Sequence, residues 1–166
     1  MSSDLFSEIP LGHADHAIQI VEAALEARGI PRAQFSQPDG PKREKRYALA
    51  RGSAVTLIQV SRPAMSLSVH DVGRIRIVAP VVSLPGEELR AELFQQLLTE
   101  NATLSGAAFG ITAREVILVT ERSVQDLDES EVEHMIDTIS AAADHYDDLL
   151  AARYGVARAA DGGAPG

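Results

Sequence analysis

The sequence predicts an α+β fold in which helices pack on an antiparallel five-stranded sheet, with the element order α-β-β-β-α-β-β-α. The hydrophobic period changes from helical to alternating and back, twice along the chain. The alternating segments come in consecutive runs joined by short turns, which favours antiparallel pairing over the helical crossovers of a parallel sheet. The length of 166 residues suits one such domain with a sizeable core.

The first predicted element is a helix from Asp15 to Arg28. Gly29 and Pro31 mark its end, because glycine accepts the left-handed conformation and proline cannot continue a helix. Its apolar side chains recur at spacings of three and four residues, at Ala14, Ala17, Ile18, Val21, Ala24 and Leu25. Residues 1–12 contain no basic residue and no apolar run, so we expect a flexible N-terminal arm without an export signal.

Three predicted strands follow a loop over residues 36–45. The second strand, over residues 55–60, is apolar and rich in β-branched side chains, and Pro63 is expected to interrupt or end it. Residues 65–70 either extend that strand or form a short strand of their own. Alternation of apolar with polar or small side chains defines the first and third strands, at Tyr47, Leu49, Ile75, Ile77, Ala79 and Val81. Together these segments predict a meander with one buried face.

The second half of the chain predicts a helix, a hairpin and a long helix. The first of these helices spans residues 87–100, and two short strands follow between residues 107 and 120. Asp128 is a good N-cap with Glu131 three positions later, as in a capping box. The last helix then continues to about residue 152, with the strongest helical periodicity in the chain.

These elements predict a single domain over residues 13–155. Residues 156–166 hold few large apolar side chains and are expected to form a disordered tail. No stretch approaches the roughly 18 consecutive apolar residues of a membrane span. We therefore expect a cytoplasmic protein with no membrane partner.

The composition excludes several classes of protein. Lys and Arg number 15 against 24 Asp and Glu, which gives a net charge of -9 and argues against a nucleic-acid partner. The cluster of Lys42, Arg43, Lys45 and Arg46 favours a solvated loop over a phosphate contact. The chain has no cysteine, which excludes disulfide scaffolds, thiol redox centres and cysteine nucleophiles.

The negative charge is concentrated in the second half of the chain. Residues 1–83 hold 10 basic and 8 acidic residues, whereas residues 84–166 hold 5 basic and 16 acidic ones. Between residues 126 and 150 there are nine carboxylates and no Lys or Arg. This helix face either keeps the protein soluble or offers an acidic surface to a basic partner segment, with Asp144, Asp147 and Asp148 as candidate contacts.

Residue patterns for catalysis or metal binding are weak. The sequence has neither a phosphate-binding glycine loop nor a Gly-x-Ser-x-Gly nucleophile elbow. His13 and His16 have a spacing that two metal ligands can use, but no third ligand is evident, and His70, His134 and His145 each adjoin an acidic residue. We therefore expect no catalytic residue, cofactor or metal. The alternative is a small enzyme, or a ligand- or metal-binding protein, with a histidine-containing pocket.

Two segments carry a family resemblance. The first is LLTENATLSGAAFGITAREVILVTERSV, in which Leu97, Leu98 and Asn101 end a helix and residues 106–111 enter a strand hairpin. The second is ADHYDDLLAARYG, which closes the last helix between Ala143 and Gly155. Both resemble the YbjN domain family and, more distantly, the chaperones of type III secretion. The element order is also similar to the fold of the secretion chaperones.

The resemblance implies a non-enzymatic, cytoplasmic, homodimeric protein. Secretion chaperones bind extended segments of client proteins, and YbjN-type proteins have been described as sensory-transduction regulators. We therefore expect a chaperone-like module or regulatory adaptor that binds a protein segment through an apolar sheet face or an edge strand. The resemblance places the candidate dimer contact on the second helix, at Leu89, Leu93, Phe94 and Leu97. Alternatively, this stripe packs on its own sheet.

Overall fold

The computed structural model describes residues 12–31, 44–51, 54–61 and 73–161. Helices and strands follow one another in these ranges in the order that the sequence predicts. In chain order they are α1 (His13–Ala27), β1 (Glu44–Arg51), β2 (Ala54–Ser61), β3 (Arg74–Ser83), α3 (Glu87–Asn101), β4 (Ala108–Ile111), β5 (Glu115–Ser123), α4 (Glu129–Tyr154) and a short 3-10 helix (Ala159–Asp161). The described residues thus confirm the α+β fold and its element order.

Some predictions concern residues outside these ranges. They are residues 1–11 of the arm, residues 36–43 of the loop with Lys42 and Arg43, Pro63, residues 65–70 with His70, and residues 162–166 of the tail. The structure tests none of them.

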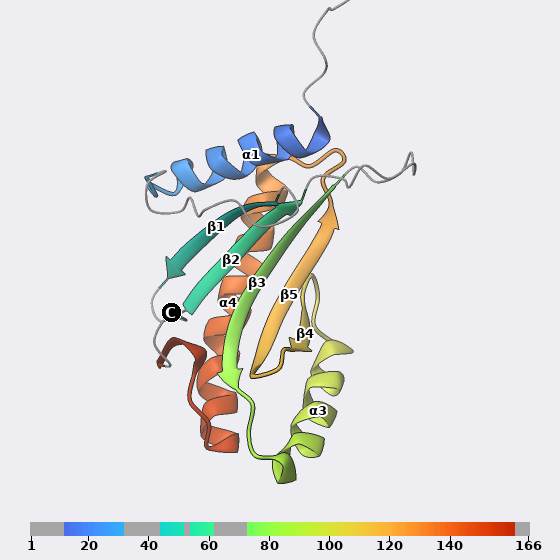
Figure 1. The fold of residues 1–166 in the computed structure, drawn as a ribbon, viewed down its shortest axis with the longest axis vertical. Helices are drawn as coiled ribbons and strands as arrows, with labels where there is room; N and C mark the ends of the chain where they lie inside the picture. The colour runs from blue at the N-terminus through green and yellow to red at the C-terminus, as the bar shows by residue number, and fades with distance from the viewer. Residues whose placement is uncertain (1–11, 32–43, 52–53, 62–72, 162–166) are drawn as a thin grey trace, which may run out of the picture.

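The five strands form one antiparallel sheet in the order β1-β2-β3-β5-β4. The meander of β1, β2 and β3 is local, whereas β3 pairs with β5 across the intervening α3 and β4 (Figure 1). Within β3, Ile75, Ile77 and Ala79 are buried, whereas Arg74 and Arg76 are exposed. The alternation read from the sequence therefore separates a core face from an outer face.

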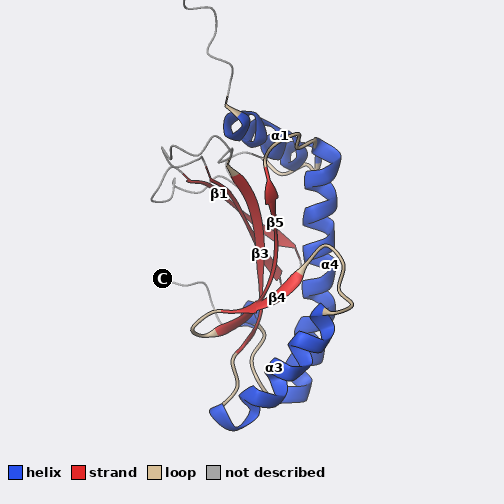
Figure 2. Ribbon diagram, turned by 90° about the vertical axis from the view of Figure 1, so that its right-hand side faces the viewer, coloured by secondary structure: helices blue, strands red, loops and turns tan. Residues whose placement is uncertain are grey.

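The helices cover one face of the sheet. Figure 2 shows α4 running along that face, with α1 across one end and α3 near the other. The side chains of α4 that point at the sheet are buried and make up much of the core: Val132, Met135, Ile136, Ile139, Ala143 and Leu150. None of the helices in the described ranges has both the length and the hydropathy that a membrane crossing requires.

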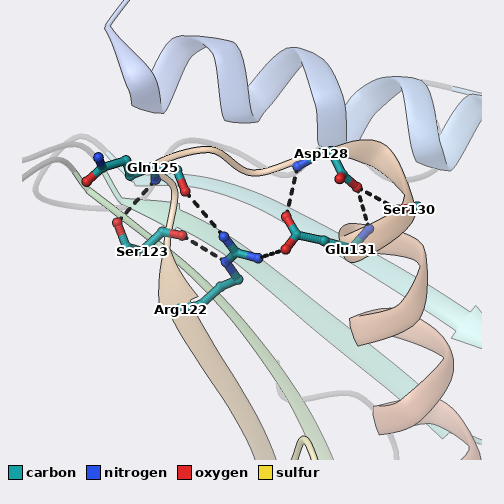
Figure 3. A network of polar contacts seen from close by, with 6 residues as sticks. All are labelled: Arg122, Ser123, Gln125, Asp128, Ser130 and Glu131. Carbon is teal, nitrogen blue, oxygen red and sulfur yellow. Dashed lines mark hydrogen bonds and ion pairs between the residues drawn. The ribbon is translucent and has the colours of Figure 1, made fainter.

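A polar network fixes the start of α4 against the end of β5 (Figure 3). The Asp128 side chain accepts hydrogen bonds from the Glu131 N–H at 2.8 Å and the Ser130 hydroxyl at 2.7 Å, while Glu131 accepts the Asp128 N–H at 3.1 Å. The predicted capping box is therefore present. Arg122 of β5 forms an ion pair with Glu131 and donates to the Gln125 carbonyl at 3.2 Å, so strand, turn and helix are joined.

The C-terminal end of the fold differs from the prediction. The last helix continues two residues further than predicted, to Tyr154, and Gly155 ends it in the left-handed conformation at φ 63°. Residues 156–161, which the sequence predicts to be part of a disordered tail, hold defined positions beside β3. Composition alone missed this because most of the contacts are made by backbone groups and one arginine, and Val156 is the only side chain of the segment larger than alanine that packs against the core.

Candidate functional site

The outer face of the sheet carries a continuous row of apolar side chains. The strand register places Ala48 opposite Leu57, Leu57 opposite Val78, Val78 opposite Val119, and Val119 opposite Ala108. These five residues, the apolar row, cross all five strands. Along the strands they alternate with the buried residues Tyr47, Ile58, Ile77, Leu118 and Phe109, so they lie on the face away from the core. Strands lie about 4.8 Å apart, so the row is about 19 Å long. That is the length of roughly six residues of extended peptide.

The apolar row is most exposed at Leu57 of β2. The side chain of Leu57 is 39% exposed, and Val55, which lies on the same face two residues earlier, is 43% exposed. Val78 and Val119 are half-buried. Exposed apolar side chains that adjoin one another on a sheet are the usual signature of a binding surface.

A charged row runs parallel to the apolar row. The register places Arg46 opposite Gln59, Gln59 opposite Arg76, and Arg76 opposite Glu121. Glu121 accepts ion pairs from Arg76 at 3.5 Å and from Arg74 at 2.6 Å. The outer face is therefore apolar on one side and polar on the other, which suits a peptide with both kinds of side chain.

The outer edge of the sheet at β4 is closed by Asn101. Its amide donates to the Phe109 carbonyl at 3.1 Å and accepts the Phe109 N–H at 2.6 Å. The side chain therefore takes the place of a neighbouring strand at this position. Asn101 is one of the residues that carry the family resemblance in the sequence, and these two hydrogen bonds give it a structural role.

The candidate dimer contact on α3 divides into two parts. Leu93 and Leu97 are 0% and 4% exposed and belong to the core of the chain itself. Leu89 and Phe94 are partly buried, and Leu98, one turn after Phe94, is 70% exposed. Two of the four predicted contacts thus pack on the chain's own sheet. The dimer contact stays a prediction, and Leu89 and Phe94 are the two predicted contacts that are not fully buried.

The three candidate acidic contacts on α4 differ in their surroundings. Asp144 and Asp148 are exposed, whereas Asp147 is 5% exposed and lies on the core-facing side of the helix. Burial raises the pKa of Asp147, because a carboxylate loses its hydration there, and the nearby Asp148 and Asp144 act in the same direction. Asp148 forms an ion pair with Arg158 at 2.9 Å.

The four histidines of the described residues are all exposed. His13 and His16 are exposed at the start of α1, and His134 and His145 are exposed on α4. In the described ranges, no three or more His, Asp or Glu side chains are grouped to hold a metal ion. A shallow polar depression between α3 and the end of α4 is lined by Glu92, Gln95, Gln96, Thr99, Glu100 and Arg153, with no histidine among them.

Comparisons with known proteins agree with this architecture. The model of the family "TY-Chap1: T3SS (YopN, CesT) and YbjN peptide-binding chaperone 1" matches residues 15–162. The crystal structure of the ExsC-ExsE complex is similar with a TM-score of 0.60 and 16% identity, over 82% of this chain and 95% of that chain. The HopA1-SchA chaperone-effector complex is similar with a TM-score of 0.53 and 6% identity, over 85% and 99%.

The family match confirms the resemblance to YbjN and the secretion chaperones. At such identities the two structural similarities show the fold alone. No curated protein matches the sequence.

Proposed function

Because the chain belongs to the family of peptide-binding chaperones that includes the type III secretion chaperones and YbjN, we propose that it binds an extended segment of another protein. The segment lies on the outer face of the sheet, along the apolar row. The chain acts as a chaperone or regulatory adaptor in the cytoplasm, without catalysis and without a cofactor. The two similar structures support the protein-binding role, since both are described as complexes, one of a chaperone with an effector.

The observation that carries this proposal is the apolar row itself. A helix covers the other face of the sheet, but the row of Ala48, Leu57, Val78, Val119 and Ala108 is only partly covered. Covering the exposed part of Leu57 contributes about 1 kcal/mol, from a scale of about 1.5–3 kcal/mol for a whole leucine side chain. Several such contacts along one row give a useful affinity without a deep pocket.

We also propose that two copies associate through α3. Leu98 is 70% exposed, and the partly buried Phe94 lies one turn before it on the helix surface. Leu89 lies more than two turns before Leu98, on another side of the helix. Burial of such an exposed apolar side chain as Leu98 under a partner surface would favour association of the two copies. The second copy would leave the apolar row open, since α3 lies on the other side of the sheet (Figure 2).

A peptide selection tests the binding proposal. Random extended peptides are selected on the wild-type protein by phage display, and the affinity of the best peptide is measured by fluorescence anisotropy. Leu57→Asp is expected to weaken binding by more than ten-fold, because it removes an apolar contact and forces a carboxylate to lose water. The matched control is Leu149→Asp, since Leu149 on α4 is 41% exposed, close to the 39% of Leu57.

Loss of binding in both variants, or in neither, contradicts a site on the outer face. Failure to select any peptide contradicts the proposed function as a whole. Circular dichroism of both variants establishes that they are folded before affinities are compared.

A further inference from the structure

The C-terminal segment, residues 156–161, pairs with the end of β3. After Gly155 the chain reverses, and Arg158 forms an antiparallel bridge with Val82. The Ser83 N–H donates to the Ala157 carbonyl over 3.0 Å. The other side of β3 is occupied by β5, which pairs with both Val82 and Ser83. The C-terminal segment therefore lies on the β2 side of β3, as an added strand would.

This side of β3 is available because the β2–β3 pairing stops early. The last partners are Leu57 and Val78, and Pro80 follows two residues later. Proline has no N–H to donate to a neighbouring strand. The strand nevertheless continues to Ser83, so its last residues offer backbone groups that β2 does not use. In this structure the C-terminal segment uses them.

The side chain of Arg158 connects the C-terminal segment to α4. Arg158 donates to Asp148 at 2.9 Å, and through two further N–H groups to both oxygens of Asp161 at 3.0 Å. Asp148 belongs to the acidic face for which the sequence left two roles open, solubility or contact with a basic partner segment. In the structure the chain itself supplies a basic group to this carboxylate.

The C-terminal segment is held loosely. Ala157, Ala160 and Asp161 are exposed, and the short 3-10 helix contains no buried residue. Val156 at the start of the segment is half-buried against the core, and beyond it the segment is held by one short backbone pairing with β3 and by the ion pair of Arg158 with Asp148. Exposed ion pairs contribute little to stability. Segments with few buried contacts open most readily in a folded protein.

From these contacts we infer that the C-terminal segment is an internal occupant of a second peptide site, which an extended client segment carrying an arginine can take over. The site consists of the β3 edge at Val82 and Ser83 and the carboxylate of Asp148. This inference rests on the proposed function, because it assigns a partner chemistry and a form of regulation to a peptide-binding protein. The client adds a short strand to β3 and places its guanidinium on Asp148.

The bound C-terminal segment sets a minimum affinity that a client peptide must reach. A tethered segment competes at a high effective concentration, so a free peptide must bind well enough to displace it. Weak clients are excluded, and clients with an arginine in register are favoured.

The probe for this site is an acetylated, amidated peptide, Val-Ala-Arg-Ala-Ala-Asp, which has the sequence of residues 156–161. Binding to the full-length protein is followed by two-dimensional NMR at the Ser83 amide. Arg158→Glu detaches the chain's own segment, because a carboxylate then faces Asp148. Arg153→Glu is the matched control, since Arg153 also lies near the end of α4 and pairs with an exposed acid, Glu92, at 3.0 Å.

Arg158→Glu is expected to bind the probe about five-fold more tightly than wild type, which is the upper range for the loss of an exposed ion pair. Arg153→Glu is expected to bind it as wild type does. A second peptide with glutamate in place of arginine is expected to bind Arg158→Glu weakly. Equal binding of the arginine probe by all three proteins, or no binding to Arg158→Glu at millimolar probe, overturns the inference.

A reversible cross-link gives an independent test. The chain has no cysteine, so Ser83→Cys combined with Ala157→Cys introduces one disulfide between directly opposed strand positions. The oxidised protein is expected to lose probe binding, and dithiothreitol is expected to restore it. Probe binding that is the same in both redox states also overturns the inference.

These outcomes are separable from those of the proposed function. If selected peptides bind the apolar row and are lost in Leu57→Asp, the proposed function stands even when the Arg158→Glu results contradict the internal occupant. If no selected peptide binds anywhere, the proposed function fails, whatever the probe does.

Discussion

Replacing Asn101 by alanine should weaken the fold at one edge of the sheet. The amide of Asn101 makes both of the hydrogen bonds that connect α3 to the Phe109 backbone, at 2.6 and 3.1 Å. Phe109 is 7% exposed, so water reaches the abandoned N–H and carbonyl poorly. A hydrogen bond of this kind contributes about 1 kcal/mol, and an unpaired buried group costs about 1–3 kcal/mol.

The expected loss for Asn101→Ala is therefore about 2–3 kcal/mol of unfolding free energy. Alanine favours the helix over asparagine, which offsets about 0.5 kcal/mol of this loss at the end of α3. Asn101→Asp should lie between wild type and Asn101→Ala, because a carboxylate still accepts the Phe109 N–H but repels the carbonyl. Gln95→Ala, an exposed position on the same helix, is the control and should change stability little.

Urea denaturation followed by circular dichroism measures these differences from the midpoint and the slope. Hydrogen exchange at the Phe109 amide supplies a local measure, and exchange should accelerate in Asn101→Ala. A stability of Asn101→Ala within about 0.5 kcal/mol of the Gln95→Ala control would refute the assigned role. An unpaired β4 edge should also increase self-association on storage, which light scattering detects.

Three further predictions concern charge and assembly. Asp147→Asn should raise the melting temperature at pH 7. The pKa of Asp147 is raised in the folded chain, so the ionised carboxylate lowers stability above that pKa. The gain in melting temperature should vanish well below pH 3.8, where the carboxyl is protonated in both the folded and the unfolded chain. Hydrogen bonds from Ser130 and from the Glu131 N–H lower the pKa of Asp128, so its stabilising contribution is present above pH 3.8 and is lost as the pH falls through the folded pKa. Asp128→Ala should therefore melt earlier than wild type at pH 7, and the two melting curves should converge in strong acid. Leu98→Glu should shift the light-scattering mass from a dimer to the 17.7 kDa monomer, and a wild-type protein already monomeric at micromolar concentration would contradict the proposed α3 contact.

The periodicity of the sequence was enough to predict the elements but not their pairing. Alternation in β3 and the capping box at Asp128 follow from local rules, and the structure confirms both. The apolar row was not predictable, because it depends on the register between strands that lie far apart in the sequence. Ala48 and Ala108 belong to it only through the pairing of three intermediate strands. Leu57 and Val78 gave a partial sequence signal for the row, because they are apolar residues at strand positions whose side chains face away from the core.

The sequence left the role of the acidic helix face open between solubility and a basic partner segment. Asp148 was one of the candidate contacts for such a partner, and the structure places Arg158 of the same chain against it. This contact depends on the reversal of the chain at Gly155. A single glycine in a segment of small residues is a weak sequence signal for such a reversal. Asp147 was expected on the exposed face of the helix together with the other acidic residues. This was wrong, because its position on the helix turns the carboxylate toward the core.

The place of α4 as the last long element has a consequence for how the chain folds as it is made. The whole sheet, up to Ser123, leaves the ribosome before the helix that covers its inner face. Until Tyr154 has emerged, the nascent sheet exposes apolar side chains on both faces. The pairing of β3 with β5, which joins Arg74 to Ser123, closes a long loop and should be the slow step before that helix docks. During synthesis this protein therefore passes through the kind of exposed state that it is proposed to shield in others.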